Sequence, residues 1–294
     1  MKTLLPILVW CLLLVISGPE FLHAHWESAL IQFAALALVP PGLQLLGRPF
    51  LAWHWLPVAG LCAGFWLFPQ PIAPWLSLPY VLWALWETIR AGLNVLVYRK
   101  FSLPEVIRVF ALGYWATGAA FAGFFLAGFG PLGFDAVLVG LTAAHFHLAG
   151  FVLTVVAYRL YRFQPGRTNR ILALATLAGM PLVATGIVLT KLGYSPVTEW
   201  ASALGFAALA LAVAGKQAAI AFDKKNTLTT KYLWLAGSAC LFAGAVLAIL
   251  YALRFHWPLS WINIPNMKIW HGTLNALGFG WLSLTAWKIN ATPN

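Results

Sequence analysis

Charged side chains are scarce in this sequence. Its 294 residues include seven Asp and Glu and 18 Lys and Arg, so only 9% of the chain is charged while 62% is hydrophobic. An ordinary soluble domain has about 25% charged residues. This composition excludes a soluble globular protein and indicates an integral membrane protein in contact with the lipid bilayer.

Several enzyme motifs are absent as well. The sequence has no P-loop, no GxGxxG after a strand, and no HExxH, GxSxG or CxxCH. Nucleotide-driven, zincin, α/β-hydrolase and c-type haem functions therefore have no support. Cys11, Cys62 and Cys240 form neither a CxxC pair nor a metal-ligand spacing, and we interpret them as buried hydrophobic residues. The net charge of +11 is attributed to membrane topology, with no nucleic acid partner.

Long apolar runs fill most of the chain. A transmembrane helix needs about 20 predominantly apolar residues, and ten runs reach or approach this length. The sequence therefore predicts an all-α, polytopic transmembrane helix bundle of about ten spans, which forms a single domain over residues 1–294. The runs are 3–17, 27–46, 51–68, 74–97, 106–129, 136–158, 170–190, 198–221, 232–253 and 268–288.

The first 24 residues have an alternative interpretation. Lys2 precedes a short apolar run, which is typical of a signal peptide. The segment Leu22-His23-Ala24 matches a small-residue cleavage site poorly, so we favour a retained first span.

Lys and Arg are distributed unevenly between the two ends of the predicted spans. With the N-terminus inside, only Lys191, Arg254 and Lys268 lie on the outer side, and Arg90 lies within a span. This asymmetry predicts cytoplasmic N- and C-termini in a bacterial cytoplasmic (inner) membrane. The inner set comprises Lys2, Arg48, Arg99, Lys100, Arg108, Arg159, Arg162, Arg167, Arg170, Lys216, Lys224, Lys225, Lys231 and Lys288.

The fourth predicted span contains polar residues along one helical face. Tyr80, Trp83, Glu87, Arg90 and Asn94 follow one another at intervals of three or four residues. Glu87 and Arg90 are three positions apart and close enough to pair. Because ionisable groups within a span are costly, each is a functional hypothesis by default. The pair is either a self-neutralised lock between helices or part of a ligand or proton-handling site.

The sixth predicted span contains His145 and His147. Residues two positions apart point about 200° away from each other in a regular helix, so one metal ion cannot bind both. His145 shares a face with Asp135 and Thr142, whereas His147 lies on a face of small residues that lets another helix approach. These histidines either form hydrogen bonds between helices or take part in ligand or proton chemistry.

The tenth predicted span contains His271 and Asn275 on one face. Counted from the inner basic residues, these two, His145, His147 and Glu87 lie at depths of roughly 18–25 Å. We therefore predict one shared polar site in the middle to outer half of the bundle, built from the fourth, sixth and tenth spans.

A second candidate metal site lies at the outer mouth. His23, His25 and Glu27 form an HxHxE cluster, and neutral imidazole is a common ligand of Zn and Cu. The alternative is a solvated loop without a metal.

Three segments of the sequence resemble the YndJ-like family of bacterial membrane proteins. They are Trp86-Glu87-Thr88-Ile89-Arg90-Ala91-Gly92-Leu93-Asn94, His145-Phe146-His147-Leu148-Ala149-Gly150-Phe151 and His271-Gly272-Thr273-Leu274-Asn275-Ala276-Leu277-Gly278-Phe279. The resemblance covers most of the chain from about the fourth span onward. Members are multi-span helical proteins, sometimes described as transporters. The resemblance implies fold and location, and it transfers no catalytic residue.

The HxH of the sixth span is also similar to a short element of haem–copper oxidase and nitric oxide reductase subunits. There, such histidines ligate metal centres on opposite sides of one helix. The further membrane histidines and the tyrosine chemistry of those enzymes have no clear counterpart here. His271 is the only other histidine within a span, and His54 lies near an inner end. Haem is therefore the less favoured cofactor.

We arrive at one leading hypothesis and two alternatives. In the leading hypothesis, His145, His147 and His271 bind a transition metal (Zn, Cu or Fe) or handle protons together with Glu87, in a membrane-embedded enzyme. The first alternative is a proton-coupled transporter of small molecules, and the second is a structural or assembly subunit. A small or lipid-soluble substrate would contact residues of the same three spans, namely Tyr80, Trp83, Arg90, Asn94, Thr142 and Asn275.

Overall fold

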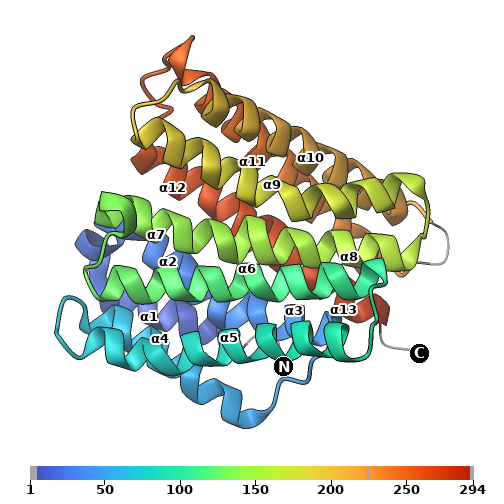
Figure 1. The fold of residues 1–294 in the computed structure, drawn as a ribbon, viewed down its shortest axis with the longest axis horizontal. Coiled ribbons are helices and arrows are strands. Elements are labelled where there is room, and N and C mark those ends of the chain that lie inside the picture. The colour runs from blue at the N-terminus through green and yellow to red at the C-terminus, as the bar shows by residue number, and fades with distance from the viewer. Residues whose placement is uncertain (1–4, 224–225, 292–294) are drawn as a thin grey trace. The chain divides into compact units, whose positions relative to one another are not determined.

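The computed structural model describes residues 5–223 and 226–291, which form helices joined by short connections (Figure 1). Each of the ten predicted spans coincides with a helical stretch, and the described residues contain no β-strand. The all-α prediction is thus confirmed. Lys2, Lys224 and Lys225, which entered the topology prediction, lie outside the described residues.

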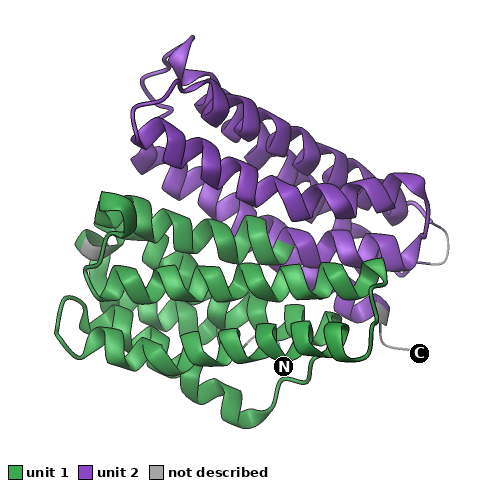
Figure 2. Ribbon diagram, in the orientation of Figure 1, with its two compact units in different colours: residues 1–152 green, residues 153–294 purple. Residues whose placement is uncertain are grey.

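The chain folds as two compact units, residues 1–152 and residues 153–294 (Figure 2). The predicted single domain stays a prediction. The first unit contains α1 (Leu5–Ala24), α2 (Trp26–Phe33), α3 (Val39–Leu45), α4 (Trp55–Leu67), α5 (Ala73–Val97), α6 (Leu103–Leu126) and α7 (Ala136–His145). The second contains α8 (Leu153–Phe163), α9 (Arg167–Lys191), α10 (Val197–Ala221), α11 (Leu228–Ala252), α12 (Ile264–Thr273) and α13 (Leu282–Ala291).

Within the residues that the structure describes, six helical stretches are long and apolar enough to cross a membrane. They establish a membrane protein, while ten spans and the N-in, C-in orientation stay predictions. Helix α5 has sufficient length at 25 residues, but it carries Glu87 and Arg90. Helix α4 has 13 residues and is about 20 Å long, shorter than a hydrocarbon core of about 30 Å. The six stretches are Trp26–Leu45, Leu103–Leu126, Ala136–Phe163, Arg167–Lys191, Val197–Ala221 and Leu228–Phe255.

The first helix packs within the first unit. The indole of Trp10 is buried and donates a hydrogen bond from Nε1 to the backbone carbonyl of Ala29 at 2.8 Å. A kink at Gly18, whose φ is 75°, precedes Pro19. This contact ties α1 to α2.

Three of the described helical stretches contain π-helical turns, which regular periodicity did not predict. They lie at Ala34–Leu38, Phe146–Val152 and Leu274–Trp281. π-Helical turns use i→i+5 hydrogen bonds, are rare, and occur frequently at functional sites. One of them contains His147 and another contains Asn275. Two of the three polar spans predicted from the sequence are therefore irregular at their polar residues.

Candidate functional site

The polar face of α5 is buried along the first part of the helix and emerges toward its end. Tyr80, Trp83 and Glu87 are buried. The side chain of Arg90 is 41% exposed, and Asn94 is exposed. The structure thus brings the first three residues into the first unit and leaves Asn94 outside this interior group.

Tyr80 is the centre of a buried hydrogen-bond chain. The indole Nε1–H of Trp115 donates to the Tyr80 hydroxyl at 2.8 Å, and this hydroxyl lies 3.2 Å from His147 Nε2. The other ring nitrogen of His147, Nδ1, lies 2.8 Å from the carbonyl of Ala143. Because a carbonyl only accepts, Nδ1 carries the proton and Nε2 accepts from Tyr80. Both nitrogens of this buried imidazole therefore have partners.

His145 points to a different environment from His147. His145 is exposed, whereas His147 is fully buried. Nδ1 of His145 donates to the carbonyl of Leu141 at 2.7 Å. Thr142 makes a similar local bond, from its hydroxyl to the carbonyl of Leu138 at 2.7 Å. The two histidines lie in different surroundings, in agreement with the expectation that they do not bind one ion together.

Glu87 has two arginine partners, one of which was missed in the sequence. Arg90 Nη2 donates to Glu87 Oε2 at 3.2 Å, as predicted for a pair on one helix. Arg48, in the segment between α3 and α4, places Nε 3.2 Å from the same oxygen. The sequence identified Arg48 only as a topology marker, since its flanking Gly47 and Pro49 gave no sign of a partner.

A second ion pair lies near this group. Arg108 Nη1 donates to Glu105 Oε2 at 2.7 Å. Burial lowers the pKa of the Arg48 guanidinium, and the positive charges of Arg90 and Arg108 lower it too, whereas Glu87 and Glu105 oppose them. These five residues, Arg48, Glu87, Arg90, Glu105 and Arg108, are called the arginine cluster below. It holds three positive and two negative side chains.

Several guanidinium nitrogens of the arginine cluster are buried without a hydrogen-bond partner. They are Arg48 Nε and Nη2, Arg90 Nε and Arg108 Nε. Arg48 Nε is within ion-pair distance of Glu87 but lacks the alignment of a hydrogen bond. Buried donors on a charged group are costly when they are unpaired. The cluster therefore has unused capacity to bind an acceptor.

Aromatic rings connect the arginine cluster to the hydrogen-bond chain. The imidazole of His54 stacks on the indole of Trp83, with ring centroids 4.6 Å apart and planes 13° apart. The same indole meets the ring of Trp115 edge-on at 4.7 Å. His54 Nδ1 accepts a hydrogen bond from the backbone N–H of Leu51 at 2.8 Å. Trp83 lies one helical turn before Glu87, so the aromatic contacts and the charged groups adjoin along α5.

In the second unit, His271 and Asn275 pack their helical stretch against α11. His271 Nδ1 donates to the carbonyl of Gly244 on α11 at 2.9 Å. Asn275 Nδ2 donates to the carbonyl of His271 at 2.8 Å. A Cβ atom on Gly244 would lie 2.9 Å from Asn275 Nδ2, so glycine permits this close approach. The predicted sharing of a face is confirmed, and the shared site with Glu87 and the other histidines stays a prediction.

A further buried network in the second unit was not predicted. Gln217 is fully buried, and its Nε2 donates to the hydroxyls of Ser283 at 2.8 Å and Ser238 at 3.2 Å. These residues come from α10, α13 and α11. Each residue is unremarkable within its own helix, because the network forms only when three helices pack together.

The outer HxHxE cluster is partly assembled. His25 Nδ1 lies 3.4 Å from Glu27 Oε1, and Glu27 is fully buried. His23 is exposed. Across the described part of the chain, no three His, Cys, Asp or Glu residues lie close enough together to hold a metal ion. The metal-binding hypothesis consequently gains no geometric support here.

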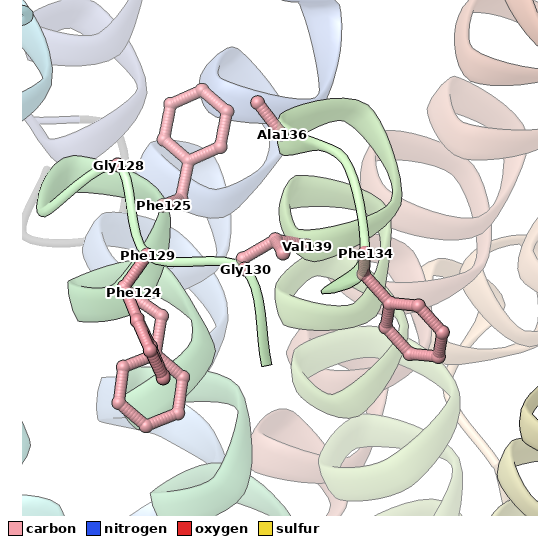
Figure 3. A pocket seen from close by; sticks show the side chains of 8 residues that line it. All are labelled: Phe124, Phe125, Gly128, Phe129, Gly130, Phe134, Ala136 and Val139. Atoms are coloured by element: carbon pink, nitrogen blue, oxygen red, sulfur yellow. The ribbon is translucent and has the colours of Figure 1, made fainter. Parts of the chain in front are cut away.

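Two hollows in the first unit are apolar. One, of about 40 Å³, lies between the end of α6 and the start of α7 (Figure 3). It is lined by Phe124, Phe125, Gly128, Phe129, Gly130, Phe134, Ala136 and Val139. The other is a groove of about 430 Å³ formed by residues of α1, α4 and the π-helical turn Ala34–Leu38. The groove is large enough to be considered as a ligand site.

Comparison with known proteins identifies one family. A family model described as YndJ-like protein matches residues 29–279. No curated protein and no solved structure matches the chain. The matched residues include all of the arginine cluster, the Tyr80 hydrogen-bond chain and His271.

Proposed function

The chain belongs to the YndJ-like family, and we propose that it is a transporter whose first unit binds an acidic, lipid-soluble ligand at the arginine cluster. The observation that carries the proposal is that the guanidinium groups of Arg48 and Arg90 share one oxygen of Glu87. With Arg108 and Glu105, the cluster has one surplus positive charge and buried N–H groups without partners. A carboxylate or phosphate group would supply both the missing charge and the missing acceptors.

In this proposal, Glu87 is the counter-ion that the ligand replaces. Without ligand, its carboxylate neutralises part of the charge of Arg48 and Arg90. An acidic ligand offers the same chemistry, and a guanidinium group can bind either a carboxylate or a phosphate through two parallel N–H groups. Exchange between an internal and an external anion keeps a counter-ion beside Arg48 and Arg90 in both states. This supports reversible binding and release.

The surrounding groups favour binding over covalent catalysis. Both ring nitrogens of His147 and the hydroxyl of Tyr80 already have hydrogen-bond partners inside the unit. A general base or nucleophile must be within reach of the reacting atom. These residues instead hold α5, α6 and the helix of His147 in place beneath the arginine cluster. Their arrangement gives the transporter hypothesis more support than the enzyme hypothesis.

The test is a titration of the purified protein in detergent, followed by native mass spectrometry. Oleate and lysophosphatidylglycerol supply acidic groups on one alkyl chain, lysophosphatidylcholine supplies a zwitterionic head, and inorganic phosphate supplies the anion alone. We expect both acidic amphiphiles to bind at least tenfold more tightly than lysophosphatidylcholine. Comparable binding of phosphate would identify a free anion as the ligand.

Three variants assign the binding to the cluster. Arg48→Gln should weaken binding of oleate at least tenfold, whereas Glu87→Gln, which removes the competing carboxylate, should strengthen it. Lys100→Gln is the matched control, because it removes one positive charge from an exposed position outside the arginine cluster. Equal affinity in wild type and a folded Arg48→Gln variant would refute the site.

Movement of the ligand is measured separately. In proteoliposomes that contain fluorescently labelled lysophosphatidylglycerol, dithionite added outside destroys the label only in the outer leaflet. We expect the wild type to raise the accessible fraction above one half and Arg48→Gln to leave it near one half. Binding without such movement would contradict the transporter assignment.

A further inference from the structure

We infer that the alkyl chain of this acidic ligand lies in the apolar groove between α1 and α4, with its acidic end toward Trp55. The inference rests on the proposed function and specifies the ligand as an amphiphile with one extended chain. The groove has a volume of about 430 Å³, and its lining is almost entirely apolar, with no charged residue. An acidic head group therefore finds no partner within the groove and must lie beyond one of its ends.

One helical face of α4 forms a long wall of the groove. Trp55, Ala59, Cys62, Ala63 and Trp66 line it at helical spacing. The distance from the first to the last of these positions is about 16 Å along the helix. One leaflet of a hydrocarbon core about 30 Å thick has nearly the same depth. The groove thus matches one alkyl chain in length.

Small side chains make this wall hollow. Ala59 and Ala63 lie between the two bulky indoles of Trp55 and Trp66. Leu13 of α1 and Leu36 of the π-helical turn complete the opposite side. A hydrocarbon chain needs only such apolar contacts.

Aromatic contacts lead from one end of the groove to the arginine cluster. The ring of Trp55 meets the ring of Phe50 at 4.8 Å, and Phe50 meets Trp83 at 5.9 Å. Phe50 follows Arg48 by two residues, and Trp83 precedes Glu87 by one helical turn. The Trp55 end is therefore the end near positive charge. Charge complementarity gives the bound chain a direction.

This direction is tested by photochemical labelling of the wild type. An 18-carbon fatty acid that carries a diazirine near its methyl end should label peptides of α1 and α4 that contain Leu13, Ala63 or Trp66. The same acid with the diazirine near its carboxyl group should label peptides that contain Pro6 or Trp55. Labelling in the reverse order, or mainly outside the groove, would overturn the inference.

A substitution that fills part of the groove provides a second test. Ala59→Phe places a ring in the hollow and should weaken binding of the fatty acid at least tenfold. Leu56→Phe is the control, because Leu56 is 75% exposed and does not line the groove. Unchanged affinity in Ala59→Phe would overturn the inference and leave the proposed function intact, provided that Arg48→Gln still weakens binding. Binding of oleate that does not depend on Arg48 would overturn both.

Discussion

Tyr80 and His147 are 67 positions apart in the sequence, yet the phenol hydroxyl and the imidazole Nε2 lie 3.2 Å apart in the interior of the first unit. The two rings are nearly parallel, with an angle of 18° between their planes. Since Trp115 donates to the same hydroxyl, one phenol joins three helical stretches. This hydroxyl therefore stabilises the packing of α5 within the first unit.

Removal of the hydroxyl should destabilise the first unit without a defect specific to ligand binding. In Tyr80→Phe, the indole N–H of Trp115 and Nε2 of His147 both lose their partner. We expect a loss of about 1–3 kcal/mol, the usual cost of unsatisfied buried polar groups. Thermal unfolding in detergent measures it. Tyr98→Phe is the control because Tyr98 is 65% exposed, and an equal loss there would contradict the prediction.

The packing around His147 should also be sensitive to the size of the neighbouring residue Gly118. A Cβ atom on Gly118 would lie 2.6 Å from Nδ1 of His147. Gly118→Ala should therefore lower the thermal midpoint, because the imidazole is fixed by two hydrogen bonds and cannot move away. At Gly92, a Cβ atom would have no neighbour within 4 Å. Gly92→Ala should raise helix stability by up to about 1 kcal/mol. Equal midpoints in the two variants would be the contrary result.

The two charges of the Glu87–Arg90 pair should differ in their importance for stability. Glu87 is buried and serves two arginines, so Glu87→Gln should cost about 3 kcal/mol or more, as expected when a buried ion pair loses one partner. The side chain of Arg90 is 41% exposed, so Arg90→Gln should cost about 0–1 kcal/mol. Thermal unfolding compares the variants. Saturating oleate should restore much of the stability of Glu87→Gln, because a ligand stabilises the state that binds it.

In the second unit, Arg254 should tolerate replacement by lysine poorly. Its guanidinium pairs with Glu199 at 2.6 Å and lies 4.0 Å from the ring centroid of Tyr251 and 4.2 Å from that of Phe255. Lysine keeps the charge but loses the planar stacking. We expect Arg254→Lys to lower the stability by about 0.5–1 kcal/mol. A thermal midpoint unchanged from that of the wild type would show that the charge alone is sufficient.

The sequence was most informative where a property belongs to one helix. The helical stretches, the shared face of Tyr80, Trp83 and Glu87, and the opposed environments of His145 and His147 all follow from the period of about 3.6 residues. The pairing of Glu87 with Arg90 has the same origin. These features need no knowledge of which helices are neighbours.

Contacts between residues of different helices could not be predicted from helical periodicity. Arg48 reaches Glu87 from a segment 39 positions away, and Trp115 and Gln217 acquire their hydrogen bonds only through packing. The predicted depth of about 18–25 Å for five polar groups contained no information on helix order. The π-helical turns were missed because a pattern analysis assumes one constant period. The YndJ-like resemblance, in contrast, is confirmed by the family match over residues 29–279.

The π-helical turn at Leu274–Trp281 has a consequence for insertions and deletions. It holds an extra residue relative to a regular helix, and it separates His271, which bonds to Gly244, from Ser283, which bonds to Gln217. Deletion of Ala276 would convert the turn toward a regular helix and rotate everything after it by about 100°. One of the two contacts would then be lost. This stretch should therefore conserve its length over evolution.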